Sequence, residues 1–122
     1  MQRQYIEQLK KGITETALLY IISEVQTYGY NIIKELEKRT TGYLLLKGGT
    51  IYPALQRLEI KGLVKSWQQR SNERRSRRYY EITDQGRQFL AKRLVEWREF
   101  SLAVSNLMGI GDVAEAASRN TA

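Results

Sequence analysis

The fold is decided by residues 48–83, GGTIYPALQRLEIKGLVKSWQQRSNERRSRRYYEIT. Near the start of this stretch, apolar residues recur at intervals of three or four: Ile51, Leu55 and Leu58. This period predicts a short helix with one buried face. We expect the glycine pair to form a turn, Thr50 to cap the helix, Pro53 to fall in its first turn and Gly62 to end it.

The second part of the stretch predicts a pair of antiparallel strands. Residues 63–67 and 78–83 are rich in β-branched and aromatic residues, and a polar segment between them predicts a flexible tip. Residues 65–80 contain six cations and one anion, so this hairpin carries +5 of the formal net charge of +7. Such an excess favours a polyanionic partner, and nucleic acid is the first candidate.

Two further helices are predicted on the N-terminal side. Apolar residues at helical spacing extend from Ile6 to Val25, and the period resumes at Ile32 after Tyr28-Gly29 before it ends near Gly42. Three helices followed by a two-stranded wing are the element order of a winged helix-turn-helix. The predicted class is therefore α+β, mainly α, with a DNA-binding domain over residues 1–83.

A long helix is predicted on the C-terminal side, over residues 84–108, with Thr83 or Asp84 as its cap. Its seam residues, Ser101 included, follow one another at alternating steps of four and three, the spacing of a helix that packs along a partner helix. The predicted dimer-interface residues are Leu90, Leu94, Trp97, Val104 and Met108. Residues 109–122 show no sustained period, which predicts a flexible tail.

Composition excludes several kinds of chemistry. The 122 residues contain no Cys and no His, so disulfides, thiol nucleophiles, His bases and Cys/His zinc sites are excluded. We expect no catalytic residue, no metal and no cofactor. The longest apolar run, Ala17–Ile22, is far shorter than the roughly 20 residues that span a bilayer, and we expect a cytoplasmic protein without a membrane partner.

The helix at residues 50–60 is the predicted recognition element, because the two glycines before it permit close approach of the backbone to a major groove. Arg suits the wing, since its planar guanidinium grips a phosphate in two places. The predicted DNA-contacting residues are Tyr30, Lys47, Gly49, Thr50, Tyr52, Gln56, Arg70, Arg74, Arg75, Arg77 and Arg78. The cations are expected to hold phosphates, whereas Thr50, Tyr52 and Gln56 are expected to lie against base edges.

Three segments together resemble the PadR family of bacterial transcriptional regulators. They are YGYNIIKEL at 28–36, GTIYPALQRLE at 49–59 with KGLV at 61–64, and RRYYEITDQG at 77–86. The resemblance extends over roughly residues 9–108. It implies a homodimeric repressor that binds a near-palindromic operator in double-stranded DNA and, in many members, releases it when a small molecule or stress signal arrives. The one long final helix resembles the smaller subgroup, in which that helix supplies dimerisation.

The resemblance also implies a site for an effector. In multidrug-sensing members, a Trp at the place of Trp97 stacks on flat aromatic drugs in a pore at the dimer centre, and Leu9 of the partner subunit would contribute to that pore. A small planar aromatic effector is a candidate partner on this basis. Trp97 also fits a second interpretation, an apolar anchor of the dimer interface, and both can hold for the same side chain.

Other interpretations of the same residues stay open. A winged helix can dock a protein, its basic hairpin then meeting an acidic surface, or it can bind DNA non-specifically as an architectural protein without effector. The Arg-rich hairpin is also compatible with a solvated loop. The rings of Tyr30 and Tyr52 are compatible with partial burial in the core, their hydroxyls remaining in water, and both residues are also candidates to reach a phosphate.

Overall fold

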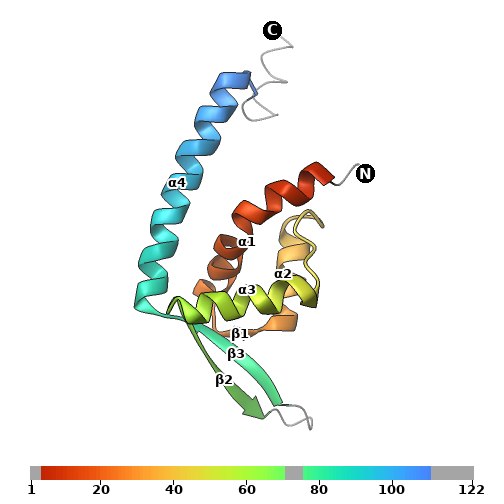
Figure 1. Ribbon diagram of the computed structural model, residues 1–122, viewed down its shortest axis with the longest axis vertical. Coiled ribbons are helices and arrows are strands. Elements are labelled where there is room, and N and C mark those ends of the chain that lie inside the picture. The colour runs from red at the N-terminus through yellow and green to blue at the C-terminus, as the bar shows by residue number, and fades with distance from the viewer. Residues whose placement is uncertain (1–3, 71–75, 111–122) are drawn as a thin grey trace. The chain divides into compact units, whose positions relative to one another are not determined.

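The computed structural model describes residues 4–70 and 76–110 (Figure 1). The elements in chain order are α1 (Gln4–Glu24), β1 (Thr27–Tyr28), α2 (Gly29–Arg39), α3 (Gly48–Ile60), β2 (Val64–Arg70), β3 (Ser76–Ile82) and α4 (Asp84–Met108). The chain divides after Leu90 into two compact units, so the first turns of α4 belong to the first unit. The predictions for the hairpin tip, including Arg74 and Arg75, and for the tail from residue 111 lie outside the described residues.

The three strands form one antiparallel sheet in the order β1-β3-β2. β2 and β3 pair along their whole length, which confirms the predicted hairpin. β1 was not predicted. Its two residues, Thr27 and Tyr28, lie opposite Tyr80 and Tyr79 of β3, and a strand this short carries no periodic signal of its own.

The core of the first unit is built from all three helices and the sheet. Its fully buried large side chains are Leu18, Leu19, Ile22, Ile32, Ile51, Leu55 and Leu58. The expected burial of the apolar face of α3 is therefore confirmed. Leu90 of α4 is only 6 % exposed and belongs to the same core, so α4 is anchored to the first unit by its initial turns.

The start of α3 differs from the prediction. Thr50 does not cap this helix, because the helix begins two residues earlier and the backbone N–H groups of Thr50 and Ile51 both donate to the Lys47 carbonyl, each at 2.9 Å. Gly48 and Gly49 therefore lie in the first turn instead of forming a separate turn. The early start also places Pro53 beyond the first turn.

The end of α3 and the start of α4 confirm the predicted signals. Gly62 has φ +78°, and its N–H and that of Leu63 donate to the last carbonyls of α3, the arrangement of a Schellman motif. Thr83 caps α4, since its Oγ1 accepts a hydrogen bond of 2.9 Å from the Gly86 N–H. The same hydroxyl donates to the Gly62 carbonyl at 2.7 Å, which ties the two helix ends together. Within the described part of the chain, no helix combines the length and apolarity needed to cross a membrane.

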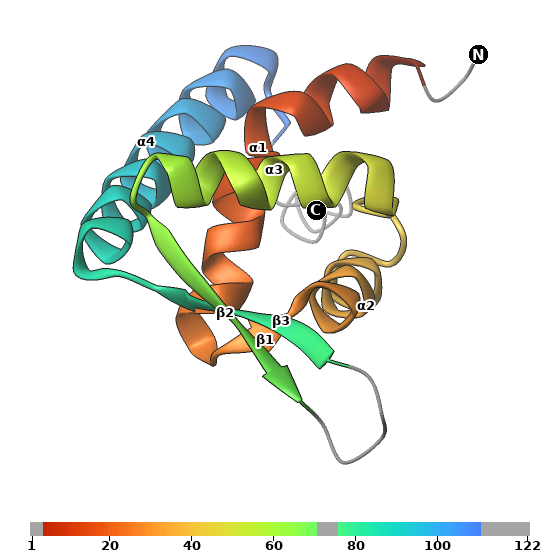
Figure 2. The ribbon, with the colours of Figure 1, turned by 60° about the horizontal axis from the view of Figure 1, so that its bottom comes forward.

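The first unit is a winged helix. α1, α2 and α3 form the helical part, and the β2–β3 hairpin extends beyond them as the wing (Figure 2). The mainly helical class, the winged helix-turn-helix and the long C-terminal helix are thereby confirmed.

Candidate nucleic-acid interface

The exposed face of α3 carries the side chains that the sequence assigned to DNA. Thr50, Tyr52 and Gln56 are exposed, while the neighbouring Ile51 and Leu55 are buried. Gly49 and Lys47 are also exposed at the start of the helix, and Arg70 is exposed at the end of β2. Burial of one face of α3 thus presents the other face, with its hydroxyl and amide groups, to an outside partner.

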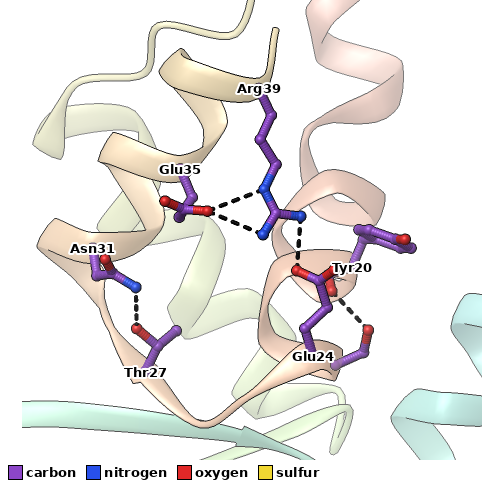
Figure 3. Close-up of polar contacts among 7 residues, drawn as sticks. Tyr20, Glu24, Thr27, Asn31, Glu35 and Arg39 are labelled. Carbon is purple, nitrogen blue, oxygen red and sulfur yellow. Dashed lines mark hydrogen bonds and ion pairs between the residues drawn. The ribbon is translucent and has the colours of Figure 1, made fainter.

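Polar contacts between α1, β1 and α2 fix the position of α2 (Figure 3). The Arg39 guanidinium donates to Glu24 of α1 at 2.7 Å and to Glu35 at 3.0 Å, and these hydrogen bonds raise the pKa of Arg39 above its ordinary value. The Asn31 side-chain amide donates to the Thr27 hydroxyl at 2.7 Å. The Asn31 contact thus ties the start of α2, next to the exposed Tyr30, to β1, whereas the Arg39 contact ties the end of α2 to α1.

A row of aromatic rings runs across the outer face of the sheet. The ring centroids of Trp67 and Tyr79 lie 6.1 Å apart in a stacked arrangement, and those of Tyr79 and Tyr28 lie 5.4 Å apart. The Arg77 guanidinium lies over the Tyr28 ring, 4.4 Å from its centroid. Because such a cation–π contact is attractive, Tyr28 holds Arg77 beside the start of α2.

Arg78 is held on the opposite face of the wing. It donates to the Ser66 hydroxyl at 2.8 Å, and that hydroxyl donates in turn to the Glu59 carboxylate of α3 at 2.8 Å. The adjacent Tyr80 is buried, and loss of solvent raises the pKa of its phenol above the ordinary value. The Arg78 guanidinium is therefore linked to Glu59 of α3 by two hydrogen bonds through the Ser66 hydroxyl.

The side chains from α2, α3 and the wing meet at one cavity of about 440 Å³. It is lined by Tyr28, Gly29, Tyr30, Tyr52, Ser76, Arg77 and Arg78. Among these lining residues two are cations and none is an anion. The structure therefore brings together four of the predicted contact residues that come from three separate elements.

The aromatic residues Tyr28 and Tyr79 were missed as members of this site. The alternation of the hairpin strands could have placed Tyr79 beside Trp67, but the contact with Tyr28 depends on the unpredicted strand β1. Lys65, which contributes to the basic count of the hairpin, pairs with Glu81 at 3.2 Å on the wing itself. Within the described residues no group of three or more acidic side chains is arranged to hold a metal ion.

The predicted interface residues of α4 differ in exposure. Leu94, Trp97 and Met108 are 39 %, 52 % and 59 % exposed, and Val104 is half-buried. Leu90 is buried in the core of the first unit. Leu9, the predicted ligand contact on α1, is 55 % exposed. Sequence spacing along one seam did not single out four further exposed apolar residues of α4: Val95, Phe100, Leu102 and Leu107.

Comparison with known proteins assigns the family. Residues 18–92 match the PadR-like family of transcriptional regulators. An uncharacterized protein of Lysinibacillus sphaericus is 33 % identical over 89 residues, 73 % of this chain and 82 % of that protein. The PadR-like transcriptional regulator of Bacillus cereus has 36 % identity and a TM-score of 0.73 over 83 % of this chain and 96 % of its own. A PadR family regulator of Eggerthella lenta has 26 % identity and a TM-score of 0.75 over 88 % and 91 %. This chain belongs to the PadR-like family of DNA-binding transcriptional regulators.

Proposed function

We propose that the protein is a homodimeric, sequence-specific repressor whose two α3 helices enter successive major grooves on one face of an operator. The observation that carries this proposal is the cavity where the exposed face of α3 meets Arg77 and Arg78 of the wing without a carboxylate among its lining residues. In such a complex the two α3 helices would lie about 34 to 36 Å apart, one turn of the duplex.

Affinity and specificity are divided between the wing and α3. Lys47 and the wing arginines (Arg70, Arg74, Arg75, Arg77 and Arg78) provide contacts to phosphates, which are independent of sequence. Thr50 and Gln56 are exposed on α3 and carry hydroxyl and amide groups that hydrogen-bond to base edges. Loss of the first group would weaken binding to every duplex, whereas loss of the second would weaken discrimination.

Dimerisation through α4 is supported by the apolar side chains that this helix leaves exposed. Trp97 and Phe100 are 52 % and 66 % exposed, and Leu107 is 84 % exposed. Large exposed apolar side chains gathered on one helix favour an interaction site, and the alternating three- and four-residue steps from Leu94 to Met108, through Ser101, fit a partner helix. A second copy of α4 supplies such a helix.

Regulation acts through the same helix in this proposal. A small molecule lodged between the protomers, or another stress signal, changes their relative angle and moves the two α3 helices out of groove register. The half-exposed indole of Trp97 offers a flat apolar surface for a planar aromatic effector. In a Trp67→Phe variant Trp97 is the one remaining tryptophan, so concentration-dependent quenching by planar aromatic compounds tests this part. Unchanged emission at saturating compound would contradict it.

The DNA-binding proposal is tested by comparing two duplexes at one fixed salt concentration. The first is the DNA upstream of the protein's own coding region, and the second is a scrambled duplex of equal length and composition. We expect the first to bind roughly 10³-fold or more tightly. Equal affinities would identify a non-specific architectural binder, and binding to neither duplex would favour a protein partner. A Gln56→Ala variant should reduce the preference while its affinity for the scrambled duplex stays unchanged.

A further inference from the structure

The Tyr52 ring is wedged between the first residues of two helices. A Cβ atom placed on Gly29, the first residue of α2, would lie 2.6 Å from Tyr52 Cε1 and 2.9 Å from its hydroxyl oxygen. A Cβ on Gly48, the first residue of α3, would lie 3.3 Å from Cε2 on the other edge of the ring. The two glycines thus leave room for the ring and fix the position of the hydroxyl at the cavity.

The two arginines that line this cavity are also held by contacts with neighbouring side chains. Arg77 is held from one side by the Tyr28 ring, and Arg78 is held from the other by Ser66. The ion pairs among the described residues include neither guanidinium, and the Glu59 carboxylate reaches Arg78 only through the Ser66 hydroxyl. Two arginines and four hydroxyl-bearing residues therefore line a space of about 440 Å³ that has no acidic residue among its lining.

Two other cavities among the described residues of the first unit lack this combination. One is lined by Ile6, Tyr43, Leu45 and the Thr41-Gly42 turn, and none of these residues is charged. The other mixes Lys65 and Arg87 with carboxylates: Glu24, Glu81 and Asp84. Of these three cavities, only the one at Tyr52 has arginines and no carboxylate among its lining residues, which is the composition that suits an anion.

We propose that this cavity seats one phosphate group of the DNA backbone, with the Tyr52 hydroxyl donating a hydrogen bond to a non-bridging phosphate oxygen between Arg77 and Arg78. A tetrahedral phosphodiester accepts hydrogen bonds from several directions, which suits donors on different walls. This inference rests on the proposed function and refines it, because it assigns Tyr52 to a phosphate and not to a base edge. One phosphate would then lock the wing to α2 and α3.

The test combines Tyr52→Phe with duplexes in which one phosphate at a time is replaced by an uncharged methylphosphonate. Tyr52→Phe keeps the ring and removes only the hydroxyl, and we expect it to weaken binding to the unmodified duplex about tenfold for each protomer, as for a hydrogen bond to a charged group. At a single position in each half-site the methylphosphonate should weaken wild-type binding and abolish the difference between wild type and Tyr52→Phe. Tyr43→Phe, which removes a hydroxyl from a remote exposed tyrosine, should bind like wild type at every position.

Three results would overturn the phosphate seat while leaving the DNA-binding proposal in place. They are unchanged affinity of Tyr52→Phe, a tenfold difference that persists at every methylphosphonate position, and a difference that follows the identity of one base pair. Failure of the wild-type protein to bind any duplex would overturn both proposals. Equal melting temperatures of wild type and Tyr52→Phe exclude misfolding as the cause of a weakened complex.

Discussion

Gly29 and Tyr52 lie in direct contact, although one begins α2 and the other lies in the second turn of α3. The space that a Cβ would occupy at Gly29 is filled by the edge of the Tyr52 ring, 2.6 Å from that point. Tyr52 is 49 % exposed, so a Cβ at residue 29 would displace its ring toward solvent. The identity of residue 29 therefore controls where the Tyr52 hydroxyl lies.

Gly29→Ala is expected to displace the Tyr52 ring and to weaken DNA binding about tenfold, similar to loss of the hydroxyl itself. The stability of the fold should change by less than about 1 kcal/mol, because the helical preference of Ala offsets part of the displacement. Titration of duplex DNA and thermal unfolding measure the two effects. Gly12→Ala is the matched control, since a Cβ there meets no atom within 4 Å, and it should keep full affinity. Full affinity in Gly29→Ala would show that the position of Tyr52 has no part in binding.

Replacing Arg74, Arg75 and Arg77 by Ala should weaken binding to all duplexes and flatten its salt dependence. Each lost phosphate contact reduces the slope of log affinity against log salt by about 0.9, so the triple variant should lose about 2.7 for each protomer, or about 5.4 for a dimer with both wings on one duplex. The matched control replaces three exposed lysines away from the wing, Lys11, Lys38 and Lys92, by Ala. If the slope of log affinity against log salt fell by the same amount in both triple variants, net charge and not the wing would explain the binding.

Gly86→Ala is expected to destabilise the fold by about 1 to 3 kcal/mol. A Cβ at this position would lie 2.7 Å from Ile82 Cγ1 and would press on the backbone carbonyl of Leu63, which has no freedom to move aside. Chemical denaturation measures the loss. The α4 N-terminus joins the wing to the end of α3 through Thr83. An unchanged denaturant concentration at the unfolding midpoint would mean that this junction packs more loosely than described.

Glu15 should make the stability of the fold dependent on pH. Partial burial alone would raise the pKa of its carboxyl, but hydrogen bonds and charge from Lys61 at 2.9 Å and Arg57 at 3.2 Å outweigh burial and hold the pKa below its ordinary value. The carboxylate thus stabilises the folded state above its unfolded pKa, and that contribution is lost as the pH falls through the lowered pKa.

The corresponding experiment compares wild type with Glu15→Gln from neutral to acidic pH. Glu15→Gln should cost about 0.5 to 1 kcal/mol at pH 7, as expected for partly exposed ion pairs, and the difference should shrink as the pH falls through the lowered pKa of Glu15. Glu7→Gln, which removes a carboxylate that pairs with Lys10 of its own helix, serves as the control. A difference that is independent of pH would assign the effect to packing.

Much of this fold could be predicted because its signals are local. The period of Ile51, Leu55 and Leu58 identified the buried face of α3, and Gly62 and Thr83 marked two helix ends by their backbone and side-chain chemistry. The start of α3 could not be predicted in this way. A glycine pair disfavours helix by its own propensity, but here burial of Ile51 and the amide contacts to Lys47 override that preference.

The site was predictable in its charges and not in its geometry. The strand pattern of the hairpin and its charge count placed Arg77 and Arg78 on the wing. Their meeting with Tyr52 depends on β1 and on the contact with Gly29, and both arise from pairing between residues far apart in the sequence. Leu90 illustrates the same limit, since its place in the α4 seam is regular although the structure buries it in the core of the first unit.

Replacing Leu94 and Val104 by Asp should give monomers that bind the operator poorly, because unpaired carboxylates oppose burial in an interface. Sedimentation velocity measures the oligomeric state, and circular dichroism verifies that helix content is retained. Lys92→Asp, at an exposed position off the predicted seam, should remain dimeric. Dimers of the Leu94/Val104 double variant would place the interface elsewhere on the chain.

The central claim is that two chains present two α3 helices to one duplex. Its most direct test is the mass of the complex between the wild-type protein and the upstream duplex, measured by sedimentation equilibrium at saturating protein. The account predicts a protein mass of two 14.2 kDa chains on each duplex, with no detectable species carrying one chain. A saturated complex with a single chain on each duplex would contradict it.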